Sequence, residues 1–272
     1  MSIIIYCVIH IIIDKTKEIT EVKTIAICNQ KGGVGKTTTA IELAVCLHNK
    51  HKNVLLVDFD QQGNLSQYVD ISKEKNIYGV LHADYPLDDA IQSKEFFDVI
   101  ASSKQLTRAD REFIGQDDVY LLSDLFEMVS DRYDFIIIDN SPSRNILLNM
   151  AYVAADYVIV PTECDAGSIS GILAIEEDIN ALRESRNAMS HATIAAIILT
   201  KYEKTIMHET AKEALESSAA NDIKGNPFVM VVRKSIRASE AKSMMQSMQE
   251  YDKYGNPAVD YRKITDRLLK EV

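Results

Sequence analysis

A glycine-rich segment at residues 31–39 contains the residue types that best fit a defined chemistry. Its sequence is Lys-Gly-Gly-Val-Gly-Lys-Thr-Thr-Thr. Glycines allow backbone N–H groups to close around phosphate oxygens, and a helix that starts there adds its positive dipole end. Lys36 brings a full positive charge to the β- and γ-phosphates, and the hydroxyl of Thr37 is placed to ligate Mg²⁺. The segment therefore predicts a site for nucleotide phosphates.

The flanks of this segment agree with a phosphate-binding loop. A β-branched run at 24–27 precedes it and a helix-like segment at 40–47 follows it, as the G-x-x-x-x-G-K-[ST] motif requires. The first glycine of that motif is missing, because the eight residues begin at Gln30, and a second lysine, Lys31, stands in the loop. A lysine at the mouth of the loop is poorly placed to serve its own cradle. It could reach a phosphate held by a facing subunit.

Two carboxylates end the next apolar run. Residues 54–57 are Val-Leu-Leu-Val, the pattern of a buried parallel strand, and Asp58 and Asp60 follow. Residues that leave the C-terminal end of a parallel strand face the ligand crevice. Alternate residues of an extended segment also point the same way. One acid can therefore sit near the water shell of the metal while the other orients an attacking water.

A third carboxylate, Asp139, ends the apolar run at 135–138. This is the pattern of a Walker B strand, whose aspartate holds Mg²⁺ through a water. The turn that follows, Asn-Ser-Pro-Ser, can respond to the γ-phosphate.

Strand-like and helical patterns alternate along the rest of the chain. Strands are predicted at 156–162 and 193–200, and helices at 168–183 and 209–218. Between residues 65 and 132 we expect short helices at 77–81 and 87–91, a strand at 96–101 and a helix at 119–132. This alternation predicts an α/β fold with a doubly wound, mostly parallel sheet flanked by helices.

We expect a single domain over residues 24–272, preceded by an apolar extension and a linker at 1–23. The apolar run at 3–13 is too short to span a bilayer, which needs about 20 residues. It also lacks the basic start and the cleavage site of a signal peptide. An extra strand, or an extension packed on the domain or on its dimer mate, is favoured over membrane contact.

Composition narrows the class of protein. The four cysteines are far apart, which indicates a reducing cytosol with neither a disulfide framework nor a zinc site. The formal net charge of −10 leaves DNA binding possible only through a local basic patch. Arg233, Lys234 and Arg237 follow a strand-like run and form one candidate patch, and a second set of basic residues lies within 260–272. A solvated face is the plainer interpretation of each set taken alone.

The loop, the aspartate pair and the Walker B strand together resemble those of ParA/Soj-type partition ATPases. These are deviant Walker A proteins of the P-loop NTPase class, a group that includes MinD and the nitrogenase iron protein. The resemblance covers roughly residues 24–270. Lys31 matches the signature lysine of the family. Residues 236–241 are similar to its R-x-S-E-A segment.

Two departures from the family pattern lie in turns. Residues 57–64 resemble the D-x-D-P-Q-G-N segment, with Gln61 in place of proline, which we expect to change loop stiffness rather than chemistry. Residues 139–143 stand where the family often has D-x-P-P-S. There Ser141 replaces a proline, so a less rigid switch turn is expected.

The resemblance implies an ATP-dependent sandwich homodimer in which each Lys31 reaches the phosphates of the other subunit. ATP and Mg²⁺ are the implied cofactors. Implied nucleotide contacts are Lys31, Gly32, Gly33, Val34, Gly35, Lys36, Thr37 and Thr38. The implied catalytic residues are Lys31, Lys36, Asp60 and Asp58, with Asp60 positioning the lytic water. The implied metal residues are Thr37, Asp139 acting through water, and Asp58 near the metal shell.

The resemblance also implies partners. The ATP-bound dimer of the family binds DNA without sequence preference, and a centromere-binding ParB-type protein stimulates hydrolysis and release. Arg237 is the first DNA-contact candidate, while Arg233 and Lys234 are weaker ones that could instead flank the base. Since an extension of about 23 residues leaves no room for a helix-turn-helix domain, operator binding is assigned to a partner. A cytoplasmic, nucleoid-associated bacterial protein without stable membrane association is expected.

Three other functions are compatible with a nucleotide-binding loop of this kind. A MinD-like membrane-cycling ATPase would use the amphipathic segment 260–272, whose thin apolar side, diluted by Asp266 and Glu271, fits a packed helix better. An electron-transfer ATPase like the nitrogenase iron protein would need paired cluster cysteines, and Cys164 has no counterpart after the Walker B strand. A nucleotide-binding regulator without hydrolysis would need a broken catalytic set.

Overall fold

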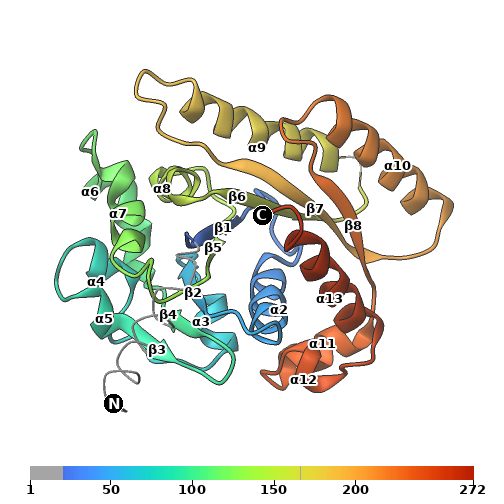
Figure 1. Ribbon diagram of the computed structural model, residues 1–272, viewed down its shortest axis with the longest axis horizontal. Coiled ribbons are helices and arrows are strands. Elements are labelled where there is room, and N and C mark those ends of the chain that lie inside the picture. The colour runs from blue at the N-terminus through green and yellow to red at the C-terminus, as the bar shows by residue number, and fades with distance from the viewer. Residues whose placement is uncertain (1–20, 166) are drawn as a thin grey trace, which may run out of the picture.

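The computed structural model describes residues 21–165 and 167–272. Within them one eight-stranded sheet has the order β3-β4-β2-β5-β1-β6-β7-β8 (Figure 1). Neighbouring strands are parallel except for β3 and β4, which run antiparallel. This architecture confirms the predicted α/β fold. The predicted role of the apolar run at 3–13 falls outside the described residues and stays a prediction.

The strands have the following bounds: β1 Lys23–Ile27, β2 Val54–Phe59, β3 Ile91–Ser93, β4 Asp98–Ile100, β5 Phe135–Asn140, β6 Tyr157–Thr162, β7 Thr193–Tyr202 and β8 Phe228–Arg233. The α-helices are α2 Lys36–His48, α3 Asn64–Tyr68, α4 Ile77–Leu81, α5 Leu87–Ala90, α6 Ala109–Glu112, α7 Leu121–Glu127, α8 Ile146–Ala154, α9 Ser168–Arg183, α10 Ile206–Asn221, α11 Ile236–Ser243, α12 Met248–Tyr251 and α13 Asn256–Leu268. Two 3₁₀ turns are Lys104–Arg108 and Asp118–Tyr120.

The sheet separates two hydrophobic cores. Helices α7 to α10 cover one face, and α2, α3 and α13 cover the other (Figure 1). Alternation along a strand assigns its residues to opposite faces. In β5, Ile136 and Ile138 join the first core, while Phe135 and Ile137 join the second. Because both faces are covered, the central strands consist of continuous apolar runs, as predicted.

Strand register brings the acidic residues to one edge of the sheet. Asp58 at the end of β2 lies opposite Asp139 of β5, and Asp139 in turn lies opposite Ile27 at the end of β1. The loop that follows β1 therefore begins at the same height as both carboxylates. Parallel strands place such residues together at their carboxyl ends.

Some element boundaries differ from those predicted. The helix predicted at 119–132 is shorter, because successive i→i+3 turns at Val129 and Arg132 replace the helical bonds before β5 begins. Helix α10 starts earlier than predicted, at Ile206, where the Thr205 side chain accepts a hydrogen bond from His208 N–H. Strand β3 was not predicted, since three half-exposed residues give no clear alternation.

The C-terminal helix α13 is part of the core. Tyr261, Ile264 and Leu268 are buried with residues of α2 and β8. The apolar face that a membrane-surface helix would need is therefore already covered by protein. In the part of the chain that the structure describes, no helix combines the length and apolar character needed to cross a bilayer.

A buried carboxylate links α2 to the C-terminal helices. Glu42 is fully buried, and its Oε1 accepts a hydrogen bond from Met248 N at 2.5 Å at the start of α12. Burial raises the pKa of this carboxyl from 4.5 to about 7. Nearby, the Tyr68 hydroxyl donates to Gln246 O at 2.6 Å. Helices α2 and α3 thus both hold the short segment between α11 and α12.

We predict that Glu42→Gln raises the melting temperature more at pH 8 than at pH 5. Between pH 4.5 and about 7 the folded state keeps a proton that the unfolded state releases, so stability falls as pH rises through this window. The amide stays neutral and its oxygen can accept the same hydrogen bond. The expected gain in unfolding free energy is about 1–3 kcal/mol at pH 8. Circular dichroism melts without nucleotide measure it.

The matched control is Glu213→Gln, the same exchange at an exposed position of α10. This control should change the melting temperature little at either pH. An equal gain from Glu42→Gln at both pH values would contradict the prediction.

Candidate functional site

The loop between β1 and α2 adopts the shape of a phosphate cradle. Gly33 and Gly35 have φ angles of 78° and 94°, in the left-handed region that favours glycine. Helix α2 begins directly after Gly35, so its first N–H groups face the loop. The Lys36 side chain folds back, and its Nζ donates to Asn29 O at 3.0 Å and to Lys31 O at 3.2 Å. These two carbonyl oxygens hold the ammonium over the space that the loop encloses.

Thr37 and Asp139 form the candidate metal site. Thr37 Oγ1 donates to Asp139 Oδ2 at 2.7 Å, while Asp139 Oδ1 is buried without a hydrogen-bond partner. Burial, followed by repulsion from Asp58, raises the pKa of Asp139 to about 8. A divalent cation would supply the missing charge and would favour the ionised carboxylate. A hydroxyl and a carboxylate oxygen fit Mg²⁺, which usually keeps water and phosphate oxygens as its other ligands.

The two acids that follow β2 have different surroundings. Asp58 is fully buried, and its Oδ2 accepts hydrogen bonds from Ser66 N at 2.7 Å and from Ser66 Oγ at 2.5 Å. Its Oδ1 accepts from Asp60 N at 3.3 Å, so the carboxylate fixes the turn between β2 and α3. Asp60 Oδ1 accepts from Gln62 N at 2.9 Å. The structure thus brings both acids to the edge that Asp139 and Lys36 share.

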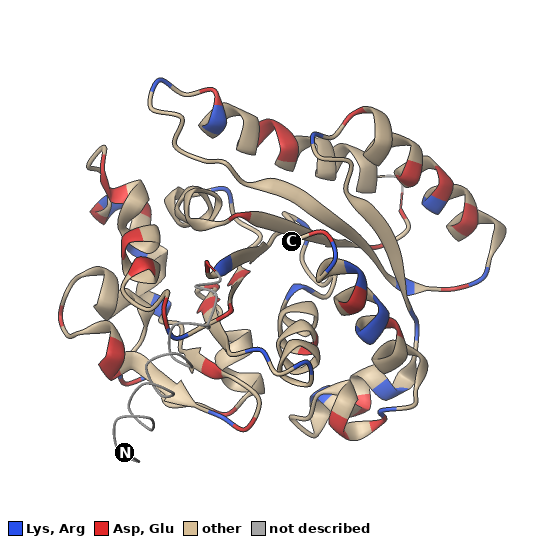
Figure 2. Ribbon diagram, viewed as in Figure 1, with Lys and Arg blue, Asp and Glu red and all other residues tan. Residues whose placement is uncertain are grey.

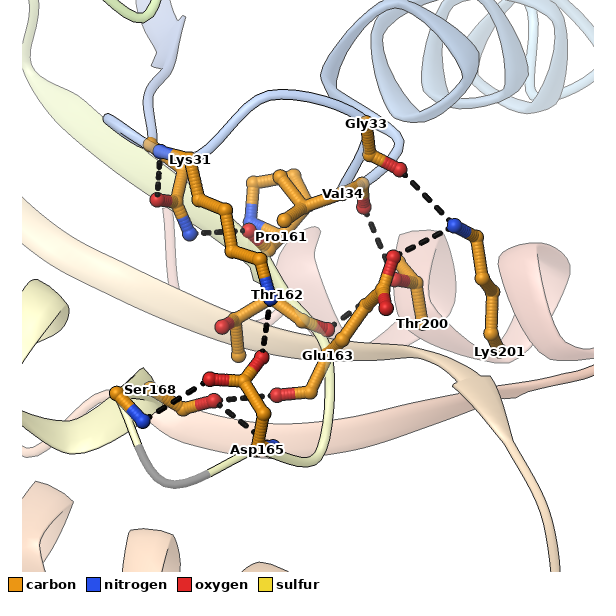
Figure 3. A network of polar contacts seen from close by, with 12 residues as sticks. Lys31, Gly33, Val34, Pro161, Thr162, Glu163, Asp165, Ser168, Thr200 and Lys201 are labelled. Carbon is orange, nitrogen blue, oxygen red and sulfur yellow. Dashed lines mark hydrogen bonds and ion pairs between the residues drawn. The ribbon is translucent and has the colours of Figure 1, made fainter.

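Lys31 does not enter its own cradle. Its Nζ lies 2.6 Å from Asp165 Oδ2, on the loop after β6 (Figure 3). The side chain of Lys31 is 51% exposed, and its ammonium is held outside the cradle by Asp165 of the same subunit. That the lysine serves a facing subunit stays a prediction.

Several residues that support the loop were not predicted. Thr200 Oγ1 donates to Val34 O at 2.9 Å, and Lys201 Nζ donates to Gly33 O at 3.1 Å and contacts Glu163 at 2.6 Å (Figure 3). Both residues lie near the end of β7. The only available signal was their place at the carboxyl end of a predicted crevice strand.

Arg144, which follows the Walker B turn, was also missed. Its Nε lies 2.9 Å from Asp178 Oδ2 of α9. With the Gln30 amide oriented so that its oxygen accepts, the same guanidinium also holds Gln30 at 2.7 Å. The switch turn and the start of the phosphate loop are thus connected through one arginine.

A hollow of about 260 Å³ opens beside the loop. Gly35 and Thr38 line it from the loop and α2, and Pro257 and Tyr261 line it from α13. Its walls are mainly apolar, and it lies next to the residues that would hold phosphates. Lys201, Arg233 and Lys234 also line it.

The three candidate DNA-contact residues differ in how closely acidic side chains hold them. Arg233 makes a bidentate ion pair with Asp260, with contacts of 2.9 and 2.7 Å, and Lys234 pairs with Glu203. Arg237 is 59% exposed and lies 3.7 Å or more from the nearest acids. Figure 2 shows acidic and basic residues interspersed on α11 to α13. Arg237 is therefore the least engaged of the three.

Comparison with known proteins identifies similar chains. A family model described as an AAA domain matches residues 22–193. The chromosome partitioning protein ParA of Myxococcus xanthus is 31% identical over 91% of this chain and 88% of its own. The sporulation initiation inhibitor protein Soj of Bacillus subtilis is 32% identical over 85% and 91%. A solved structure of a plasmid partition protein from Borrelia burgdorferi, bound to AMPPNP, is 25% identical with a TM-score of 0.79, covering 93% of this chain and 100% of that one.

We predict that Asp139→Asn abolishes the strengthening of ATP binding by Mg²⁺. The amide keeps an oxygen for Thr37 but removes the charge that a cation needs. Titration of a fluorescent ATP analogue, with Mg²⁺ or with EDTA, should show a gain of about tenfold or more in the wild type and little gain in the variant. The control is Asp98→Asn, at the amino end of β4, whereas Asp139 lies near the carboxyl end of β5. A variant that keeps the full Mg²⁺ effect would remove Asp139 from the metal site.

Proposed function

Because the chain belongs to the ParA/Soj family of partition ATPases, we propose that it segregates DNA by an ATP-driven cycle of dimerisation and release. The observation that carries this proposal is that the two lysines of the loop lie in different places. Lys36 closes over its own cradle, whereas the half-exposed Lys31 lies outside that cradle, against Asp165 of the same subunit. Such a pair suits a nucleotide that is enclosed by two copies of the chain.

Features on both sides of the loop support ATP as the ligand. The loop N–H groups and Lys36 would hold its phosphates, and Thr37 with Asp139 would hold Mg²⁺. The apolar hollow lined by Thr38 and Tyr261 would receive the base. The bound cation supplies positive charge to the β- and γ-phosphate oxygens.

The residues of the site act mainly by positioning and electrostatics, as phosphoryl transfer requires. Asp60 orients the attacking water. Burial lowers the pKa of Lys36, and the nearby carboxylates of Asp139 and then Asp60 act in the opposite direction. Asp60 therefore also favours the protonated form of Lys36. Asp58 holds the turn that carries Asp60, and its predicted place near the metal shell stays a prediction.

DNA binding is proposed for the ATP-bound dimer, with Arg237 as the principal contact. Arg233 and Lys234 are engaged by acids, so few phosphates are contacted by each protomer. A small number of phosphate contacts gives a modest salt dependence. Since the chain carries a net charge of −10, binding depends on this local patch and on the two copies that a dimer brings together. A centromere-binding ParB-type protein stimulates hydrolysis and resets the cycle.

The alternative is a MinD-like membrane-cycling positioning ATPase. It is supported less, because α13 buries the apolar face with which such a helix would contact lipid. Co-sedimentation with ATP, using anionic liposomes in one arm and DNA in the other, separates the two functions. Retention by liposomes and not by DNA would favour the alternative.

We predict that Lys31→Ala and Lys36→Ala fail at different steps. Lys36→Ala should lose ATP binding by the single subunit, because its ammonium closes the cradle. Lys31→Ala should keep that binding but stay monomeric and lose hydrolysis by about 100-fold or more, because it serves the partner. Equilibrium binding, sedimentation with ATP and Mg²⁺, and phosphate release distinguish these steps. Wild-type dimerisation and turnover in Lys31→Ala would overturn the sandwich proposal.

We predict that Arg237→Glu weakens DNA binding by about tenfold or more while ATP-dependent dimerisation is kept. The substitution removes one phosphate contact per protomer and adds a repulsive charge. The slope of log affinity against log salt should fall by about two for the dimer. Fluorescence anisotropy with a non-specific duplex at several salt concentrations measures both quantities. The control is Arg132→Glu, which lies just before the amino end of β5. Equal losses of DNA affinity in both variants would remove Arg237 from the interface.

A further inference from the structure

The side chain of Lys31 has a fixed place within the single subunit. Its Nζ lies 2.6 Å from Asp165 Oδ2, and the side chains are 51% and 35% exposed (Figure 3). The carboxylate is itself oriented, because its Oδ1 accepts a hydrogen bond from Gly167 N at 3.0 Å. On the lysine side, the backbone N–H of Lys31 donates to Asn29 Oδ1 at 2.8 Å. Both partners are thus held by their own loops.

The two loops are also connected to each other next to this ion pair. Asn29 Nδ2 donates to Pro161 O at 2.8 Å, at the end of β6. Lys201 links Gly33 of the phosphate loop to Glu163, which lies two residues before Asp165 (Figure 3). These contacts fix the distance between the phosphate loop and the segment that carries Asp165. The pairing of Lys31 is therefore a property of the assembled site rather than of a free surface side chain.

We propose that Asp165 holds Lys31 in reserve while the subunit is alone, and that each subunit must release this contact before its Lys31 reaches the nucleotide of the partner. The inference rests on the proposed function, because it requires that Lys31 acts across a dimer. It adds that dimerisation is opposed by a specific contact within each subunit. Asp165 is a positioning residue and does not touch the nucleotide of its own subunit in this account.

The strength of the contact suits a restraint that ATP can overcome. An exposed lysine–carboxylate pair shifts an equilibrium by about 1.5- to 5-fold. A symmetric dimer must break two such pairs, so their effects multiply to about 2- to 25-fold in the dimer dissociation constant. A triphosphate carries more negative charge than one carboxylate and is the better partner for the ammonium once the second subunit is present.

The test measures the dimer dissociation constant by sedimentation with a non-hydrolysable ATP analogue and Mg²⁺. Asp165→Asn should lower it by about twofold or more, and Asp165→Glu, which keeps the charge, should return it toward the wild-type value. The matched control is Asp89→Asn, since Lys75 and Asp89 also lie 2.6 Å apart with exposures of 45% and 46%, away from the site. A change of less than about twofold in Asp165→Asn, or an equal change in Asp89→Asn, overturns the inference.

A second measurement examines the contact without a dimer. In nucleotide-free protein, acylation of Lys31 followed by peptide mass spectrometry should be faster in Asp165→Asn than in the wild type, with Lys75 unchanged. Faster acylation without tighter dimerisation would show a contact that restrains nothing, and the inference would fail alone. If the wild type remains monomeric with the ATP analogue, the proposed function fails and the inference falls with it.

Discussion

The arrangement of the site depends on a buried carboxyl group whose ionised form the protein alone does not satisfy. Asp139 is almost fully buried, one of its oxygens lacks a partner, and Asp58 and Asp60 lie close enough to raise its pKa further. Such a cluster is costly unless cations compensate it. Lys36 compensates part of the charge from within, and a bound metal compensates the rest. The strand register that aligns Asp58 with Asp139 therefore gathers carboxyl groups whose ionised forms a bound cation would stabilise.

Much of this site was predictable because it is built from local patterns. The Gly-rich loop needs left-handed residues at fixed places, and the glycines at 33 and 35 provide them. The apolar runs before Asp58 and Asp139 predicted buried parallel strands, and parallel strands necessarily collect their carboxyl ends at one edge. That Lys31 stays out of its own cradle followed from its place at the mouth of the loop. In each case a short segment and one general rule were sufficient.

The remaining features depend on contacts between distant residues. Lys31 and Asp165 are separated by 134 positions, and nothing in the segment around Asp165 indicates a partner. Arg233 was a candidate DNA contact, yet its guanidinium is held by Asp260, which lies 27 positions later in the sequence. Glu42 looks like an ordinary helix former, and only the packing of α12 on α2 reveals it as a buried acceptor. Sequence patterns specify which face of a helix or strand is buried, but they do not specify which distant side chain will contact that face.

The two turn residues that replace family prolines show how local geometry is kept by other means. Ser141 Oγ accepts a hydrogen bond from Ser143 N at 3.2 Å, and next to Gln61 the Asp60 carboxylate accepts one from Gln62 N. Side-chain acceptors of this kind hold a turn without the fixed φ angle of proline. The lower rigidity that the sequence predicts for the turn at Ser141 stays a prediction, as does the changed stiffness of the loop at Gln61. Asp60 is coupled to its turn through its own carboxylate, so in the proposed mechanism a reorientation of that carboxylate toward a water would also break its bond to Gln62 N.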